Sequence, residues 1–393
     1  MIDDPVVIVA AARTPMGAFQ GAFSTVSAVE LGAVATRLAL KQSGLVSADV
    51  DELLFGCVLP ASLLQAPARQ VALAADLPLT TQCTTVNKVC GSGMKTTMLA
   101  HDQILAGSCD TAITGGMENM TQSPYFIAKA RGGLRLGHGE IKDHMFCDGL
   151  EDAYSGRLMG SFAQQTADQF TISREQMDNY AIESLTRAQT AIAQGFFDAE
   201  IAPVIVKTRK GEITVSVDEQ PGNANIEKIP KLKPAFAKEG TVTAANSSSI
   251  SDGAAALVLM KQSRANTLGL KPLARIVAHA SHAQHPSEFT MAPVGAMNKV
   301  LNAANWTVDT VDLFEINEAF AMVTLLAMQE LNLDPKKVNV NGGACALGHP
   351  LGASGARIIV TLIYALQRLK KQRGVASLCI GGGEATAIAI EMI

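Results

Sequence analysis

The sequence predicts an α/β protein built from two related halves, with a further region inserted between them. Three observations support this prediction. Short apolar segments alternate with amphipathic helical segments, two glycine-rich helix–strand units resemble each other, and residues 120–246 lack the alternation. The chain has 393 residues, of which 48% are hydrophobic and 17% charged, as is typical of a protein with a large buried core.

The first elements follow directly from the residue pattern. Residues 6–11, VVIVAA, are short, apolar and partly β-branched, and they predict a buried strand. A helix is predicted at residues 28–44, ending at Gly44, and a second strand at residues 51–58. Continued alternation of this kind predicts a largely parallel sheet that is covered by helices on both faces.

A weak repeat relates the two halves. Residues 90–119 run from a glycine-rich turn through a helix to a strand that contains Gly-Gly-Met-Glu, and residues 352–385 run the same way to Gly-Gly-Gly-Glu. We therefore predict an N-terminal half of residues 1–119 plus 247–270, and a C-terminal half of residues 271–393.

Residues 120–246 are predicted to form an inserted loop domain. They include a polar helix at residues 173–195, where Ser173 and Gln176 have the form of a capping box, and a loop-rich stretch at residues 218–236. Because insertions of this kind often carry binding surface, we expect this region to bind a ligand.

Composition and charge argue against several classes of protein. The net charge is −4 and no basic block of five residues occurs, so nucleic acid is not an expected partner. No apolar run approaches the roughly 20 residues that cross a membrane, and the start of the chain is unlike a signal peptide, so we expect a cytoplasmic protein.

The seven cysteines include no CxxC pair, which argues against a disulfide framework. His282 and His285 have no third ligand nearby, so no metal site is predicted.

Cys90 lies where a strand is predicted to turn into a helix. The segment 86–96 reads VNKVCGSGMKT, in which small residues allow a tight turn and the helix start favours a thiolate. The layout is like the nucleophile elbow of hydrolases with cysteine in place of serine, and a buried turn cysteine is the alternative. His349 lies in the matching turn of the second half, and it would face Cys90 if the halves pack around a pseudo-twofold axis.

Two further segments carry polar or reactive side chains. Cys379 follows a strand and precedes three glycines, where it would be either an acid or base at the same cleft or a buried strand end. Asn317 and Glu318 lie between an apolar strand and an apolar helix, where they would either position a water or cap the helix.

Four segments of this chain together resemble the thiolase family, and most closely its acetyl-CoA acetyltransferases, over essentially the whole length. They are VNKVCGSGMK at 86–95, EINEAFA at 315–321, GGACALGHPLGASGAR at 342–357 and CIGGGEA at 379–385. The resemblance implies a duplicated, thiolase-like layered α/β/α/β/α fold with an inserted loop domain, assembled as a homodimer or homotetramer.

The resemblance also implies a role for each motif residue. Cys90 would attack the thioester and hold the acyl group, after His349 takes its proton. Cys379 would remove the α-proton of a second acetyl-CoA. His349 and a water held by Asn317 would stabilise one negative oxygen, and the backbone N–H groups of Cys90 and Gly381 would stabilise another.

Coenzyme A thioesters are the implied substrates and partners, and no further cofactor is implied. Ser248 would contact the pantetheine chain of coenzyme A, and Met159 and Phe236 would line its path. Ala319 and Phe320 would shape the acyl pocket. The inserted region would therefore carry most of the coenzyme A binding surface.

Three residues depart from the family pattern. Leu158 stands where acetoacetyl-CoA thiolases usually have histidine, which weakens the expectation of tight acetyl selectivity. Gly222 replaces a basic residue expected to contact the nucleotide phosphates of coenzyme A. Cys345 replaces an aliphatic residue, and we interpret it as a small buried side chain.

The implied activity is acetyl-CoA C-acetyltransferase, the reversible condensation of two acetyl-CoA to acetoacetyl-CoA. A broader 3-ketoacyl-CoA thiolase of fatty-acid degradation is the alternative within the family. A ketoacyl synthase and a non-catalytic acyl-CoA carrier share the fold, but neither needs Cys379 as a second catalytic cysteine.

Overall fold

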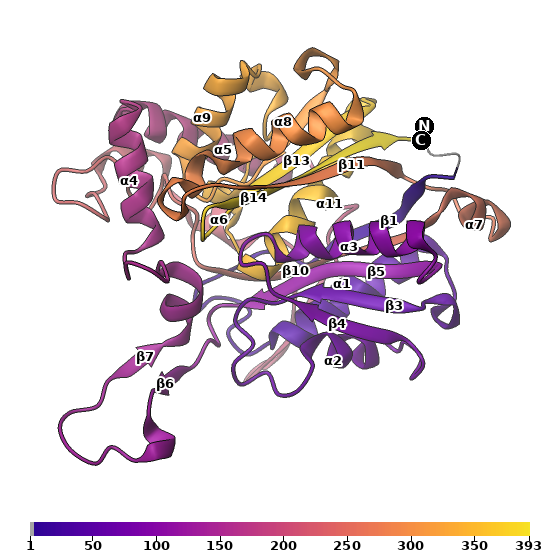
Figure 1. Cartoon of the computed structure of the whole chain (residues 1–393), viewed down its shortest axis with the longest axis horizontal. Helices are drawn as coiled ribbons and strands as arrows, with labels where there is room; N and C mark the ends of the chain where they lie inside the picture. Colours follow the sequence, from indigo (N-terminus) through magenta and orange to yellow (C-terminus); the bar gives the residue numbers. More distant parts are fainter. Residues whose placement is uncertain (1–3) are drawn as a thin grey trace.

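The computed structural model describes residues 4–393, in which ten strands form one sheet (Figure 1). The strand order is β12-β13-β14-β11-β1-β10-β5-β3-β4, with the short β2 beside β10. The strands are β1 (Val6–Arg13), β2 (Gly17–Ala18), β3 (Glu52–Gly56), β4 (Gln82–Val86), β5 (Thr111–Asn119), β10 (Ser251–Lys261), β11 (Ala274–Ala283), β12 (Leu313–Ile316), β13 (Arg373–Ile380) and β14 (Glu384–Met392).

The sheet contains one strand order twice. In the N-terminal half, β1, β10, β5 and β3 follow one another as β11, β14, β13 and β12 do in the C-terminal half. The two halves join where β1 runs antiparallel to β11, with Val7 opposite Arg275 and Ile8 opposite Ala274. The predicted duplication of the fold is therefore confirmed.

The prediction of a largely parallel sheet is wrong. Parallel pairing joins β3 to β4 and β5, and β12 to β13, whereas the other neighbours in this sheet run antiparallel. The reason is that β14 returns beside β13 directly after the turn at residues 381–383, without a crossover helix. Strands joined by a short turn pair antiparallel, and β10 occupies the corresponding place in the first half.

Helices form the central and outer layers of the protein (Figure 1). In the centre, α3 (Ser92–Ala106) and α11 (Leu351–Leu369) pack against each other and against both halves of the sheet. The outer layers are α1 (Ala28–Ser43) with α2 (Pro67–Ala74), and α8 (Ala292–Ala304) with α9 (Ala321–Leu331). The predicted α/β/α/β/α layering is thus confirmed. Within residues 4–393, none of the helices has the length and apolar character that crossing a membrane requires.

Glycines let the two central helices approach closely. A Cβ atom on Gly93 would lie 2.8 Å from the backbone nitrogen of Ala356, and one on Gly355 would collide with the backbone of Met94. Because both contacts involve backbone, a side chain at either position would push α3 and α11 apart. The small residues after His349 therefore serve the packing of these two helices.

The predicted local signals of the first half are present. β1 extends the strand predicted at residues 6–11 as far as Arg13. The helix α1 begins with a capping box of Ser27 and Glu30 and ends at Gly44, whose φ of 71° is readily adopted by glycine.

Residues 120–250 connect the neighbouring strands β5 and β10 and project from one side of the sheet (Figure 1). The helix α5 begins with the predicted capping box, in which the Ser173 hydroxyl accepts from the Gln176 N–H. The elements of this segment are β6 (Tyr125–Ile127), β7 (Ile141–Asp143), α4 (Met159–Gln169), α5 (Arg174–Ala193), β8 (Val204–Thr208), β9 (Gly211–Val215) and α6 (Glu219–Asn223).

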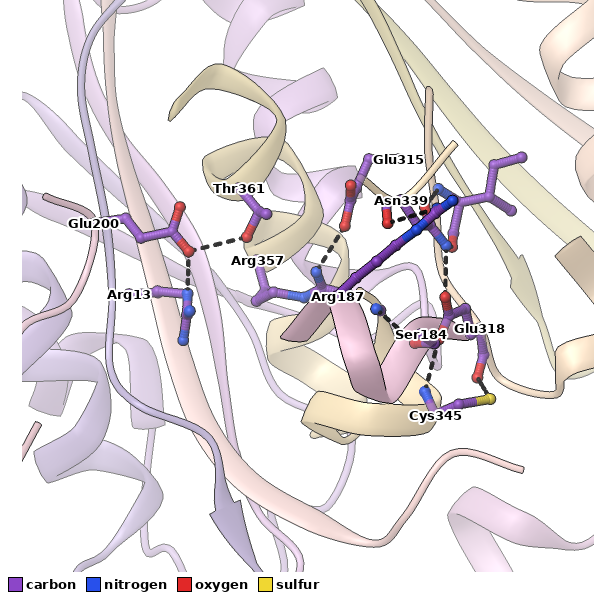
Figure 2. Close-up of polar contacts among 12 residues, drawn as sticks. Arg13, Ser184, Arg187, Glu200, Glu315, Glu318, Asn339, Cys345, Arg357 and Thr361 are labelled. Carbon is purple, nitrogen blue, oxygen red and sulfur yellow. Dashed lines mark hydrogen bonds and ion pairs between the residues drawn. The ribbon is translucent and has the colours of Figure 1, made fainter. Parts of the chain in front are cut away.

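Buried charges tie this projecting segment to the sheet and the central helices (Figure 2). Arg13 of β1 forms an ion pair with Glu200 at 2.5 Å. It forms a second ion pair with Asp218 at 2.7 Å. Glu200 also accepts a hydrogen bond of 3.1 Å from the Thr361 hydroxyl of α11. Because these charges are fully desolvated, loss of one partner would leave the others uncompensated at a cost of about 3–5 kcal/mol.

Candidate active site

A strained turn presents Cys90. Between the end of β4 at Val86 and the start of α3 at Ser92, Val89 has a φ of 46°. A β-branched residue in this left-handed region costs about 1–3 kcal/mol. The Ser92 hydroxyl accepts from the Lys88 N–H at 2.8 Å and donates to the Val89 carbonyl at 2.7 Å, and these bonds hold the turn. Cys90 therefore lies in the strand-to-helix turn that the sequence predicts.

One cavity of about 380 Å³ gathers nine of the ten residues that are predicted to act in catalysis or substrate binding. The tenth, Asn317, lies beside the lining, with its Nδ2 atom 3.5 Å from Nε2 of His349. The cavity is mostly apolar with a few converging polar groups, which is the usual form of a small-molecule site. The nine lining residues are Cys90, Met159, Phe236, Ser248, Ala319, Phe320, His349, Cys379 and Gly381.

Hydrogen bonds fix the tautomer of His349. Its Nδ1 atom lies 2.5 Å from the Ser354 Oγ atom, and the Ser354 hydroxyl donates to the Pro350 carbonyl at 2.8 Å. Because the hydroxyl hydrogen is used on Pro350, the Ser354 oxygen must accept from an N–H on Nδ1. Nε2 then keeps its lone pair, so the ring is set to act as a base through Nε2.

Asn317 follows β12 and has one unpaired atom. It does not cap α9, because the N-cap of that helix is Phe320. Its Oδ1 atom is buried and has no hydrogen-bond partner among residues 4–393. A buried polar atom without a partner is costly, so Oδ1 is suited to accept a hydrogen bond from a bound molecule.

Burial keeps Cys90 and His349 uncharged. It raises the pKa of Cys90 to about 11, although hydrogen bonds from the N–H groups of Gly381 and Cys90 itself favour the thiolate. Burial and the positive charge of Arg357 lower the pKa of His349 to about 3. The backbone N–H groups at the helix start therefore favour a thiolate as the sequence predicts, but Cys90 remains a thiol in the free protein because the loss of hydration outweighs them.

Cys379 and Gly381 lie at the end of β13 and in the turn to β14. Burial raises the pKa of the Cys379 thiol, and a negative charge on Cys90 raises it further. Gly382 and Gly383 have φ angles of 92° and 90°, so that turn requires glycine. Gly381 is different, because a Cβ atom there would make only ordinary contacts, at 3.5 Å from Met159 and 3.7 Å from Val89. The lack of a side chain at Gly381 therefore keeps this part of the cavity open for a bound molecule.

Backbone and aromatic contacts shape the wall of the cavity. The Ser248 N–H donates to the Ala319 carbonyl at 2.9 Å, which joins the segment before β10 to the segment before α9. The rings of Phe320 and Phe236 pack edge to face with centroids 6.2 Å apart. Phe236 also covers the backbone of Gly160, where a Cβ atom would collide with its ring.

Two residues that depart from the family pattern have distinct surroundings. Leu158 is the N-cap residue of α4 and lines the cavity, so it adds apolar surface to the site. Gly222 belongs to α6, and a Cβ atom there would have open space around it.

Sequence reasoning overlooked Glu118, a fully buried carboxylate in β5. It accepts hydrogen bonds from the N–H groups of Val58 at 3.0 Å, Leu59 at 3.1 Å and Gly352 at 2.8 Å. Burial raises its pKa to about 7, although these N–H groups favour the charged form. Glu118 thus fixes Gly352, at the start of α11 and three residues after His349, against the N-terminal half. An acidic residue inside the apolar strand TAITGGMEN was the available signal.

Glu318 holds the loop that carries Asn317 (Figure 2). Its carboxylate accepts hydrogen bonds from the Ser184 hydroxyl at 2.8 Å and the Cys345 N–H at 2.9 Å. It also accepts one from the Tyr180 hydroxyl at 2.8 Å. Burial and the charge of Glu318 raise the pKa of the Cys345 thiol. Cys345 lies outside the cavity lining and packs against the cluster that contains Phe320, but it is half-buried rather than fully buried as predicted.

The duplicated fold and the cavity agree with a family of acyltransferases that both halves of the chain match. Residues 6–263 match the family description "Thiolase, N-terminal domain", and residues 270–392 match "Thiolase, C-terminal domain". The chain belongs to the thiolase family.

Named relatives resemble the chain over its whole length. A protein of Dictyostelium discoideum named "Probable acetyl-CoA acetyltransferase" is 47% identical, with 99% of this chain and 94% of the relative covered. An "Acetyl-CoA acetyltransferase" of Schizosaccharomyces pombe is 46% identical, with both chains fully covered. The crystal structure of the Bacillus anthracis acetyl-CoA acetyltransferase has a TM-score of 0.97 at 42% identity, with 99% of each chain covered. A thiolase of Ascaris suum solved in complex with coenzyme A has a TM-score of 0.94 at 41% identity, with 99% of this chain and 100% of that chain covered.

Proposed function

We propose that this protein is an acetyl-CoA C-acetyltransferase, which condenses two acetyl-CoA into acetoacetyl-CoA and free coenzyme A and catalyses the reverse thiolysis. The observation that carries the proposal is the convergence of Cys90, His349 and Cys379 on one apolar cavity. Relatives that bear this name align with the whole chain, which supports the proposal independently of the cavity.

The first half-reaction transfers an acetyl group to Cys90. The Cys90 sulfur attacks the thioester carbon while its proton passes to Nε2 of His349. Because the pKa is about 11 for Cys90 and about 3 for His349, the proton moves only as the new bond forms. The departing thiolate of coenzyme A takes a proton from Cys379 and leaves as the thiol. Cys379 is then a thiolate near the protonated His349.

The second half-reaction uses this thiolate as a base. Cys379 removes a proton from the methyl group of a second acetyl-CoA, and the resulting carbanion attacks the acetyl carbon on Cys90. The bond between Cys90 and the acetyl carbon breaks, and the sulfur recovers its proton from His349. All three side chains return to their starting protonation states, so atoms and electrons balance with coenzyme A thioesters alone.

Two groups of donors are suited to stabilise the negative oxygens that form. The N–H groups of Cys90 and Gly381 lie at the Cys90 sulfur, where the oxygen of the acyl group would develop charge. The unpaired Oδ1 of Asn317 is suited to hold a water next to His349, where the enolate oxygen of the second substrate would lie. Loss of one such donor typically costs about 2.7–4 kcal/mol of transition-state stabilisation.

Mass spectrometry of the intact protein after incubation with acetyl-CoA tests the proposal. We expect an acetyl group on Cys90 in the wild type and in Cys379→Ser, because solvent can also protonate the leaving group, whereas Cys379→Ser should form no acetoacetyl-CoA. Cys83→Ser, in the edge strand β4, is the matched control and should retain both steps. An unmodified Cys90 would favour a carrier, and normal condensation by Cys379→Ser would favour a ketoacyl synthase.

A broader 3-ketoacyl-CoA thiolase is the second candidate, and the apolar Leu158 in the cavity lining favours it. Thiolysis measured over a series of 3-ketoacyl chain lengths separates the two activities. A steep fall in kcat/KM beyond acetoacetyl-CoA supports the acetyl enzyme, whereas a flat profile supports the broader thiolase. Leu158→His should narrow a flat profile, because it adds a polar group to the apolar lining.

The remaining expectations concern ligand binding, assembly and location. We propose that residues 120–246 bind coenzyme A, since Met159 and Phe236 of this segment line the cavity.

We also propose a cytoplasmic homodimer or homotetramer. Within residues 4–393, β4 pairs with β3 on one side only, so its second edge is suited to pair with another copy. Light scattering after size exclusion tests the assembly.

A further inference from the structure

A second cluster of reactive side chains lies outside the catalytic cavity, where α3 approaches β11. His101 and Asp102 belong to α3, and His279 belongs to β11. The Nδ1 atom of His101 is 3.1 Å from Oδ1 of Asp102. The Nε2 atom of His279 is 2.9 Å from the same oxygen and 3.2 Å from Nδ1 of His101. Three possible metal-ligand atoms therefore form a small triangle.

We propose that His101, Asp102 and His279 bind a divalent transition-metal ion with the ligand preferences of zinc. The triangle has the size that such an ion requires. Zinc bonds to imidazole nitrogen and carboxylate oxygen are about 2.0–2.2 Å long, so two ligands of one ion lie roughly 2.8–3.5 Å apart at octahedral or tetrahedral angles. The three observed separations, from 2.9 to 3.2 Å, fall within this range.

Hydrogen bonding alone accounts less well for this arrangement. Consecutive residues of a helix do not ordinarily face each other, yet His101 and Asp102 converge on one point. If both imidazoles donated to Oδ1 of Asp102, two N–H groups would be crowded together with their nitrogens only 3.2 Å apart. A cation removes this conflict, because each nitrogen then directs a lone pair at it. The two rings are perpendicular, at 89°, which lets both nitrogen edges point inward.

The position of the cluster determines what a bound ion would do. The helix α3 starts directly after the Cys90 turn, and β11 is the first strand of the C-terminal half. The ion would therefore cross-link the two halves of the chain at a site separate from the catalytic cavity. The Asp102 side chain is 58% exposed, so water can complete the coordination and the ion can enter from solvent. Metal should then stabilise the folded protein, and above the dissociation constant this stabilisation should grow with the logarithm of the metal concentration.

Titration of the metal-free full-length protein with Co²⁺ tests this proposal, because its absorption distinguishes histidine and carboxylate ligands from cysteine thiolates. We expect one Co²⁺ per chain, without a sulfur-to-cobalt charge-transfer band, and displacement by Zn²⁺. His279→Gln and His101→Gln should each weaken binding by at least about tenfold. His282→Gln is the matched control on the same strand, where the ring contacts Gln284, and it should bind as the wild type does.

Several results would overturn the proposal. These are no Co²⁺ binding, a charge-transfer band that assigns the ion to cysteines, or unchanged binding in His279→Gln. Because a substituted chain could fold poorly, wild-type crystals soaked in Zn²⁺ supply a second measurement. An anomalous density peak between the three side chains supports the site, and its absence at saturating Zn²⁺ rejects it. A rise of Tm with Zn²⁺ in the wild type and in His282→Gln, but not in His279→Gln, is also expected.

Discussion

Replacing Ser354 with alanine tests whether the hydroxyl of this residue holds His349 in the tautomer that acts as a base. The Ser354 hydroxyl is buried, accepts from Nδ1 of His349 and donates to the Pro350 carbonyl. Without it, the buried N–H on Nδ1 loses its partner, at a cost of roughly 1–3 kcal/mol. The ring can avoid part of this cost by moving its proton to Nε2, and the base that faces Cys90 is then lost.

The size of the effect follows from this cost. If the productive tautomer becomes less favourable by roughly 1.4–2.8 kcal/mol, kcat/KM should fall roughly 10- to 100-fold. Both half-reactions use Nε2 of His349, so acetylation of Cys90 should slow together with the overall turnover. The free energy of unfolding should fall by roughly 1–3 kcal/mol, because the hydrogen bonds of the hydroxyl are lost as well.

The assay measures the rate of Cys90 acetylation in a single turnover. The reaction is quenched at successive times, and the acetylated fraction is read by mass spectrometry. Thr361→Ala is the matched control, because it removes a buried hydroxyl from the same helix and breaks a 3.1 Å hydrogen bond to Glu200. This control should lose stability but keep the acetylation rate. A wild-type acetylation rate in Ser354→Ala would refute the tautomer argument, and an equal loss in Thr361→Ala would show a general structural effect.

Three further predictions rest on burial and packing. The alkylation rate of Cys90 by iodoacetamide should keep rising toward pH 11, because burial raises its pKa to about 11; a plateau between pH 8 and 9 would contradict this. Gly355→Ala should lower the free energy of unfolding in urea by roughly 1–3 kcal/mol, the typical cost of overpacking a core, since its Cβ would collide with the backbone of Met94. Gly222→Ala, in open space, should be neutral for stability. Because the pKa of Glu118 rises from 4.5 unfolded to about 7 folded, the folded state holds the extra proton between these values and stability should fall as pH rises through them. Between pH 5 and 7.5 the wild type should lose about 2.4 kcal/mol relative to Glu118→Gln, and parallel pH dependences of the two proteins would argue against this.

The candidate site could be predicted from sequence because its signals are local. A cysteine or histidine among glycines leaves a recognisable pattern, as in the segments around Cys90 and His349, and a duplicated strand order brings the two turns together. The cavity gathers these residues with Cys379, although these side chains come from distant parts of the chain. Local turn chemistry thus carried most of the information about the site.

Other features depend on long-range packing and could not be predicted in the same way. The direction of β10 and β14 depends on how each strand returns to the sheet, which the alternation of segments does not encode. The pKa of Cys90 depends on burial, which outweighs the helix start that its sequence suggests. His101 and His279 are 178 positions apart, so only the fold brings them within reach of one ion.

The position of β1 in the middle of the sheet has a consequence for how the chain is made. Val6 lies opposite Lys261, and Val7 lies opposite Arg275, so the first strand synthesised has both of its neighbours far downstream. At about 5–20 residues per second, the ribosome reaches these partners roughly 13–50 s after it makes β1. During that interval the apolar segment VVIVAA has no strand to pair with and is prone to associate with other chains. The yield of folded enzyme should therefore depend on what shields residues 6–11 during translation, however stable the finished sheet is.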